Sequence, residues 1–123
     1  MHTLASQGIK TNVTLIFSVA QGLMAAKSGA TYISPFVGQL DDGGNEGLKL
    51  IRDLRTVMDN YGFSTEIIAS SLRTIKDVEE VAIASSHIAA IPEALIPSLW
   101  EHALTTEGIA QYTRDWGNMN GPT

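Results

Sequence analysis

The feature that most constrains this chain is a repeated switch between two apolar patterns. Short, nearly continuous apolar runs alternate along the sequence with longer stretches in which apolar residues return every three or four positions. The first pattern predicts strands that are covered on both faces, and the second predicts helices that bury one side. Because such pairs follow one another through the chain, we expect an α/β fold with a parallel sheet.

The boundaries of these elements follow from the apolar runs and from turn residues. The predicted strands cover residues 11–17, 31–37, 65–70 and 87–91, and the predicted helices cover 19–27, 46–61, 75–84 and 105–116. Thr74 or Ser71 is available to cap the third helix, and Thr105 to start the last. Pro97 lacks a backbone donor, so we expect a short or kinked helix around it. Residues 1–116 then form one folded unit, and 117–123 a frayed tail.

Two architectures fit four parallel strands of this kind. One is a self-contained doubly wound sheet, and the other is half of a (β/α)₈ barrel, whose inner face needs a partner. In a half barrel, the first and last strands have unpaired edges, and the inner face contains Thr14, Ile16, Ile33 and either Ile68 or Ala69. Exposed edges and apolar faces drive association, so we expect the chain not to be a monomer.

Composition excludes several classes of function. The formal net charge is -5, and the basic residues are scattered singly, so we expect no nucleic-acid partner. No apolar run has the roughly 20 residues that a membrane span needs, so we expect no membrane partner. The first ten residues do not look like a secretion signal, and the absence of cysteine suits a cytoplasmic protein.

Several local motifs resemble a known family. Residues 8–18 (GIKTNVTLIFS) with Ala20 and Gln21 resemble the fifth barrel strand of transaldolases and the related fructose-phosphate aldolases, and 29–38 (GATYISPFVG) resemble the sixth. Residues 69–73 resemble the end of the seventh strand, 91–92 the end of the eighth, and 104–116 the C-terminal helix. The matches follow the family's order and cover nearly the whole chain, which favours the C-terminal half of a (β/α)₈ barrel.

The resemblance implies an activity in sugar-phosphate metabolism, within the pentose phosphate pathway. Such enzymes transfer a dihydroxyacetone unit between sugar phosphates through a lysine Schiff base, with no metal or other cofactor. By the same resemblance, Asn12 and Ser34 would bind the keto fragment, and Thr14 would position the water used in proton transfer. Phe36 stands where the aldolases have tyrosine, so its type favours transfer over free aldol chemistry.

The phosphate of the substrate would be held at the end of the seventh strand. The resemblance assigns this role to Ser71 and to Arg73, whose guanidinium group can form paired charge-assisted hydrogen bonds. Gln39 stands where the family usually has a second arginine, so we expect weaker phosphate binding than in a typical member.

The Schiff-base lysine belongs to the family's fourth strand, which this sequence does not contain. The lysines present, Lys10, Lys27, Lys49 and Lys76, fall before a strand or on a helix. We therefore expect the chain to be inactive alone, because covalent catalysis needs an amine at the site. Its partner would be a second copy of itself or a complementary N-terminal half. The alternatives are a non-catalytic, self-associating half barrel with a weak sugar-phosphate site, or a truncated relic.

Without the resemblance, the same residues have simpler interpretations. Asn12 and Thr14 would be a satisfied polar pair on a sheet, while Ser71 and Arg73 would be a helix cap and a solvated charge. His87 would be a hydrogen-bonded structural residue in a buried strand. The acidic stretch 41–46 lacks the spacing of calcium ligands and indicates a flexible loop, so we expect no metal site.

Overall fold

The strands form one parallel sheet whose spatial order follows the chain. A computed structural model describes residues 2–38 and 46–120 of the protein. The sheet order is β1-β2-β3-β4, and every neighbouring pair is parallel. The bounds are β1 (Asn12–Ile16), β2 (Tyr32–Pro35), β3 (Glu66–Ala69) and β4 (Ile88–Ala89). Each lies inside its predicted range, so the predictions placed the strands correctly and made them a few residues too long.

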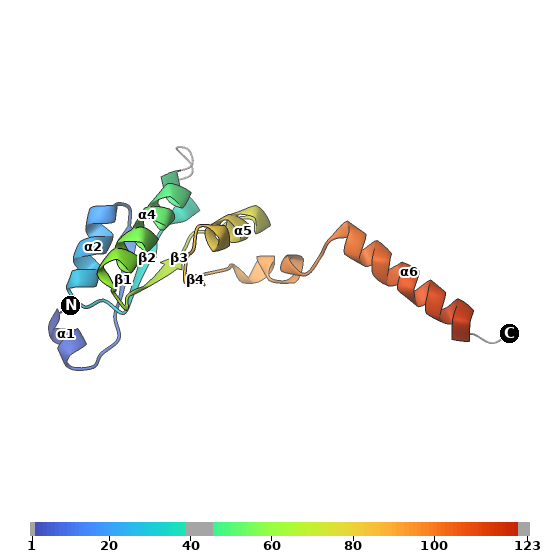
Figure 1. The fold of residues 1–123 in the computed structure, drawn as a ribbon, viewed down its shortest axis with the longest axis horizontal. Coiled ribbons are helices and arrows are strands. Elements are labelled where there is room, and N and C mark those ends of the chain that lie inside the picture. Colours follow the sequence, from blue (N-terminus) through green and yellow to red (C-terminus); the bar gives the residue numbers. More distant parts are fainter. Residues whose placement is uncertain (1, 39–45, 121–123) are drawn as a thin grey trace.

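The helices between the strands form a single layer. In Figure 1, α2, α4 and α5 lie side by side along the sheet, with α4 in the middle. Their bounds are α2 (Val19–Lys27), α4 (Glu46–Tyr61) and α5 (Ile75–Ile83), preceded by a short α1 (His2–Ser6) that the sequence did not predict. Connections between adjacent parallel strands are almost always right-handed, so a sheet built strictly in chain order places all its helices on one face.

This arrangement decides between the two architectures left open by the sequence. A doubly wound sheet reverses its strand order and carries helices on both faces, whereas the order here never reverses. Sequential parallel strands with one outer helix layer are the arrangement of a (β/α)₈ barrel. The fold is therefore that of half such a barrel.

The hydrophobic core lies between the sheet and the helix layer. Ile33 of β2 and Ile67 of β3 are in register, and both are 0% exposed, as is Leu54 of α4. A Cβ at Gly22 would lie 2.3 Å from Leu54 Cδ2 and 3.4 Å from Ile33 Cδ1. Gly22 therefore lets α2 approach both the sheet and α4 more closely than any other residue would.

No described element covers the opposite face of the sheet. Thr14 and Ile68 lie on this open face, as predicted, because they alternate with the core residues around them. The predictions for Ile16 and Ile33 were wrong, since both belong to the core on the helix-covered face. For Ile16 the cause is local: the register shifts between Thr14 and Ile16, and Leu15 has a φ of 57°, so a bulge reverses the alternation there.

The segment after β4 leaves the sheet. After β4 come two 3₁₀ turns, η1 (Glu93–Leu95) and η2 (Pro97–Leu99), and then the helix α6 (Ala103–Asn120), which extends away from the sheet in Figure 1. Pro97 occupies the first turn of η2, which confirms the predicted interruption. No helix within the described residues is long and apolar enough to cross a membrane.

The predicted bounds of the last helix were wrong at both ends. The helix begins at Ala103 because His102 caps it: its Nδ1 accepts from the Leu104 N–H at 3.0 Å. It continues past Trp116 through Gly117 to Asn120, so the predicted frayed tail is helical over 117–120. Residues 121–123 of that tail lie outside the described residues.

Candidate functional site

Three of the predicted site residues come together on the open face, where β1 and β2 run in register. Ser34 Oγ donates to Asn12 Oδ1 across the two strands at 2.7 Å, and Thr14 pairs with Ser34 in the register. Ser34 is only 3% exposed, whereas Asn12 and Thr14 are exposed. The hydrogen bond fixes the carbonyl end of the Asn12 amide, which leaves its NH₂ group as a donor for a ligand on this face.

An aromatic pair lies at the carboxyl ends of the same two strands. The rings of Phe17 and Phe36 meet edge to face, with centroids 6.2 Å apart and an interplanar angle of 69°. Phe36 also forms a backbone bridge with Ser70, which links the end of β2 to the end of β3. Phe36 therefore joins the polar pair on β1 and β2 to the residues that follow β3.

The two residues predicted to bind phosphate follow β3 directly and lie against Gly38. A Cβ at Gly38 would stand 2.1 Å from Ser71 O, 2.9 Å from Ser71 Oγ and 3.1 Å from Arg73 Nε. Only glycine leaves room for this approach. Ser71 itself has a φ of 63°, a left-handed conformation that is uncommon for serine and is typical of ligand-binding turns.

Gly38 was not singled out as a functional residue from the sequence. A signal was present in the sequence: Gly38 comes two residues after Phe36, an aromatic residue at the end of a predicted strand. Sites of (β/α)₈ barrels form at that end of the strands. Its absent side chain is what brings the end of β2 against Ser71 and Arg73.

The simpler interpretation of Ser71 as a helix cap is wrong. Thr74 caps α5 through a capping box: its Oγ1 accepts from the Asp77 N–H at 3.1 Å, and Asp77 Oδ2 accepts from the Thr74 N–H at 3.1 Å. Asp77 Oδ2 also accepts from the Arg73 N–H at 2.9 Å. These bonds fix the backbone of Arg73 while its side chain stays exposed.

The lysines lie before a strand or on a helix, as predicted, but Lys49 is near the carboxyl end of β1: it lies close to the start of α4 and lines a pocket with Phe17. Lys10 precedes β1, at the amino end of the sheet. The other three are on the helix layer: Lys27 on α2, Lys49 on α4 and Lys76 on α5. Within the described residues, no group of three or more acidic, histidine or cysteine side chains could hold a metal ion. Gln39 and residues 41–45 of the acidic stretch lie outside the described residues.

His87 is hydrogen-bonded, as predicted, although it is exposed and stands just before β4 and not inside a buried strand. Its Nδ1 accepts from the Ile67 N–H at 3.0 Å. Desolvation lowers the pKa of His87, with a further lowering from the nearby Arg55 guanidinium, against opposing effects of Glu66 and Asp59. Histidine serves here as a structural acceptor, outside the predicted site.

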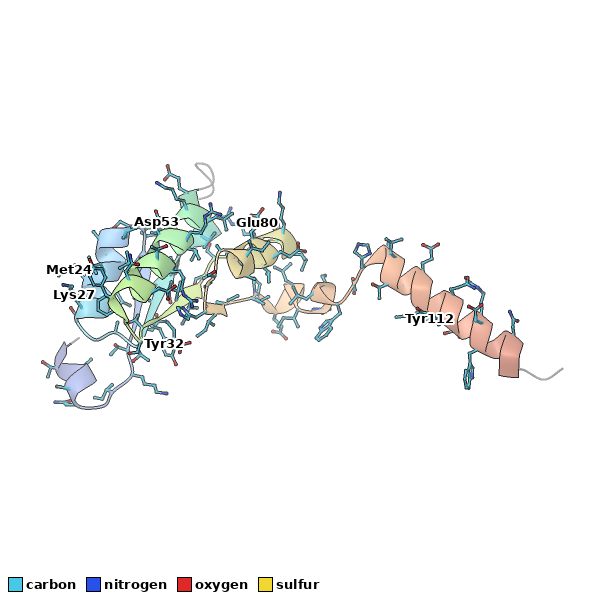
Figure 2. All side chains as sticks on the ribbon, in the orientation of Figure 1. Met24, Lys27, Tyr32, Asp53, Glu80 and Tyr112 are labelled. Atoms are coloured by element: carbon cyan, nitrogen blue, oxygen red, sulfur yellow. The ribbon has the colours of Figure 1, made fainter. Side chains whose placement is uncertain are left out.

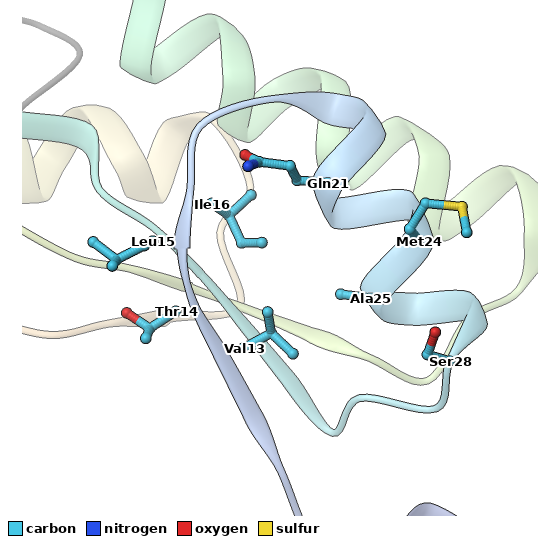
Figure 3. Close-up of a pocket in the computed structure, with 8 residues that line it drawn as sticks. All are labelled: Val13, Thr14, Leu15, Ile16, Gln21, Met24, Ala25 and Ser28. Carbon is cyan, nitrogen blue, oxygen red and sulfur yellow. The ribbon is translucent and has the colours of Figure 1, made fainter. Parts of the chain in front are cut away.

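A groove of about 400 Å³ runs along the free edge of β1. Figure 3 shows its walls: Val13 and Ile16 face α2, with Ala25 and Met24 opposite, while Thr14 and Leu15 turn away from that helix. Met24 is 62% exposed and Leu15 is 53% exposed, although both are large and apolar. Of the predicted site residues only Thr14 reaches this groove, so it is a feature of the sheet edge and not of the Asn12–Ser34 pair.

Fold and site together define a class of protein: half of a (β/α)₈ barrel with polar and aromatic groups at the carboxyl ends of its strands. The family model for Transaldolase/Fructose-6-phosphate aldolase matches residues 1–121. The chain belongs to this family.

Relatives agree with that assignment. A probable transaldolase 2 of Listeria monocytogenes is 60% identical over 116 residues, which cover 94% of this chain and 53% of that protein. A probable transaldolase of Lactiplantibacillus plantarum is 58% identical, covering 94% of this chain and 54% of that protein. The chain thus spans about half the length of the curated relatives it matches.

Solved structures of low sequence identity show the fold alone. A lactate oxidase of Pediococcus acidilactici matches with a TM-score of 0.54 and 20% identity, covering 72% of this chain and 25% of that one. A mandelate oxidase matches with a TM-score of 0.55 and 14% identity, covering 73% and 27% of the two chains.

Proposed function

We propose that this chain forms the substrate-binding wall of a transaldolase that transfers a dihydroxyacetone unit between sugar phosphates in the pentose phosphate pathway. The observation that carries the proposal is that the sheet holds two polar groups, one on its open face and one at its carboxyl edge. One is the Asn12–Ser34 hydrogen-bonded pair, and the other is Ser71 and Arg73 against Gly38. An extended ligand with a carbonyl at one end and a phosphate at the other carries the acceptors that amide and guanidinium donors bind.

Each residue has a role at the reacting end of the substrate. The Asn12 amide donates to an oxygen of the keto fragment, and Ser34, which is held by that same amide, fixes its orientation and binds a hydroxyl group. Thr14 lies beside them in register and positions the water used for proton transfer. Phe36 covers this end, where its ring excludes bulk water.

The phosphate end relies on Arg73 and on the left-handed turn at Ser71. A guanidinium group binds a phosphate through two parallel hydrogen bonds, and a hydroxyl group adds a third. Replacing Arg73 by glutamine removes the charge, and we expect phosphate binding to fall by at least tenfold. Arg52 on the exposed side of α4 is the matched control, because R52Q removes the same charge away from the site.

We propose that the reactive amine comes from a complementary half barrel and that the chain alone is inactive. The lysine positions support this, since Lys10 precedes β1 and the other three are on helices, none of them within a strand. The open face and the apolar groove along the free edge of β1 offer a surface on which further parallel strands can pair.

A second candidate is a non-catalytic assembly of copies of this chain, and α6 favours it. Its apolar residues are largely exposed, with Leu104 at 71%, Tyr112 at 77% and Trp116 at 69%. Figure 2 shows Tyr112 on this helix, away from the sheet. Several large apolar side chains exposed on one helix are typical of a surface that associates.

One experiment separates the two candidates. The chain is mixed with the part of the Listeria monocytogenes relative that lies outside the match, and fructose 6-phosphate is trapped with borohydride. We expect a covalent adduct on the added part only, and none on this chain alone. The R73Q variant should weaken trapping at low substrate concentration, and R52Q should not.

Two outcomes contradict the proposal. An adduct on any of the chain's own lysines would show that it supplies the amine itself. A stable homo-oligomer that binds fructose 6-phosphate but never forms an adduct with the added part would favour the non-catalytic assembly. We further expect the protein to act in the cytoplasm, where its proposed substrates are made.

A further inference from the structure

The last strand of the sheet is held by unusually few backbone contacts. β4 pairs with β3 only through Ile68 with Ile88 and Ala69 with Ala89, followed by the Ala90 N–H donating to Ala69 O at 2.9 Å. One residue earlier, at Ile67, side chains supplement the backbone ladder.

These side chains belong to two consecutive residues before β4. His87 Nδ1 accepts from the Ile67 N–H at 3.0 Å, while Ser86 Oγ lies 3.1 Å from Ile67 O and 2.8 Å from Ile88 O, within donating distance of both. The Ile67 N–H is therefore satisfied by the imidazole of His87, and the Ser86 hydroxyl adds a second side-chain contact beside the ladder. Of these, only the imidazole can change its hydrogen-bonding character with pH.

The turn before His87 is fixed to the helix layer. Arg55 of α4 donates from Nη1 to Ser85 O at 3.0 Å, and its Nε forms an ion pair with Asp59 at 3.0 Å. Ser85 has a φ of 73°, so this turn is held in a conformation that serine rarely adopts alone. The position of His87 is thus set by α4 on one side and by β3 on the other.

The hydrogen bond to Ile67 requires neutral His87, with its proton on Nε2. An imidazolium ion has no acceptor, so its Nδ1–H would oppose the Ile67 N–H. Three charged groups face this imidazole: Arg55 and Asp59 from α4, and Glu66 from β3. Partial desolvation and the Arg55 charge lower the pKa of His87, and they outweigh Glu66 and Asp59, which raise it. The lowered pKa agrees with a neutral ring in the folded state.

We propose that His87 is a pH-dependent latch for β4. Neutral His87 holds the edge strand on β3, and protonation of its imidazole at Nδ1 breaks the contact with Ile67 and lets β4 open. Because η1, η2 and α6 follow β4 directly, the C-terminal segment then gains freedom to move relative to the sheet. This inference is independent of the proposed catalytic function.

Amide hydrogen exchange of the full chain tests the latch directly. Protection factors, corrected for intrinsic exchange at each pH, are measured at about pH 7.5 and about pH 5, on either side of the ordinary histidine pKa. We expect the protection of the Ile67 and Ala90 amides to fall about fivefold at the lower pH, the effect of one net hydrogen bond. The Tyr32 amide, which donates to Thr11 O between β1 and β2, serves as the internal reference and should not respond.

Variants distinguish a latch from a merely structural residue. In H87N, the amide oxygen can accept from Ile67 without titrating, so protection should stay high at both pH values. In H87A, protection should be low at both. His102 is the matched control: its Nδ1 also accepts a backbone N–H at 3.0 Å, but within the α6 cap, so H102N should keep the pH response of Ile67 and Ala90.

Two results would overturn the latch. One is unchanged protection of Ile67 in the wild-type chain between the two pH values. The other is a pH response that persists in H87N. As an independent readout, nitrogen chemical shifts of the imidazole should show an unprotonated Nδ1 at pH about 7.5.

Discussion

The two faces of this sheet are built by the same strands but have opposite character. On the helix-covered face, Ile33, Ile67 and Ala69 are 0% exposed and meet α2 and α4. On the open face, the alternate residues include polar and aromatic side chains, among them the Asn12–Ser34 pair and Phe36, beside the apolar Ile68. Alternation along a strand therefore separates the residues that hold the fold from those proposed to bind a ligand.

This difference predicts that substitutions on the covered face affect folding most. Leu54→Ala removes a fully buried side chain that packs on the sheet, and we expect a loss of about 2–5 kcal/mol in the free energy of unfolding. Thr14→Ala on the open face should change it by less than about 0.5 kcal/mol. Urea titration followed by circular dichroism measures both, and similar losses for the two variants would contradict the division between faces.

The second prediction concerns how closely the helix layer approaches the sheet. A Cβ at Gly22 would lie 2.3 Å from Leu54 Cδ2, so Gly22→Ala should lower the free energy of unfolding by about 1–3 kcal/mol. Gly117 on α6 is the control, since a Cβ there meets nothing within 4 Å. Gly117→Ala should raise helix stability by about 0.5–1 kcal/mol. Equal effects in thermal unfolding would mean that α2 does not pack as described.

On the open face, Ser34→Ala should separate binding from folding. The variant loses the hydrogen bond to Asn12 Oδ1, which is worth about 0.5–1.5 kcal/mol, toward the low end because water can reach the exposed Asn12. We expect borohydride trapping with the complementary part to weaken clearly while unfolding changes little. A variant that traps as well as the wild type would remove Ser34 from the proposed site.

The smallest expected effect is a pH dependence of stability through His87. Its pKa is lowered in the folded chain, so the unfolded chain takes up a proton first as pH falls. The stabilisation is complete above the ordinary histidine pKa of about 6.5 and declines as pH drops below it. Unfolding titrations between about pH 8 and pH 5 should show this decline in the wild type and less of it in H87N. An equal decline in both would assign it to other groups.

Much of the fold followed from local signals. The bounds of α2 and α4 were predicted to the residue, because Gly29 and Gly62 end both helices and both have positive φ. The last helix was predicted less well, because its cap is a histidine, which is not among the usual capping residues, and because Gly117 does not break it. The short α1 has too few residues to show a period.

The candidate site was predictable from motif order but not from physical pattern alone. Asn12, Ser34 and Arg73 were named through resemblance, whereas Gly38 emerged only from the approach of its backbone to Ser71. Nor could the pattern place Ile16, since the left-handed Leu15 shifts the strand by one residue. A bulge leaves no mark in an apolar run. The sequence therefore could not show which face of the sheet the residues after the bulge belong to.

The sequence by itself determined the strands, the helices and the parallel arrangement of the strands. Apolar periodicity shows whether a segment is buried on one side or on both, and this distinguishes helices from strands covered on both faces. The sequence also determined the family, through motifs in a fixed order. Only the tertiary structure decided that α2, α4 and α5 cover one face, that no described element covers the other, and that His87 takes the place of a strand partner. These depend on which segments meet in space, and residues as distant in the chain as His87 and Ile67 leave no local trace of their contact.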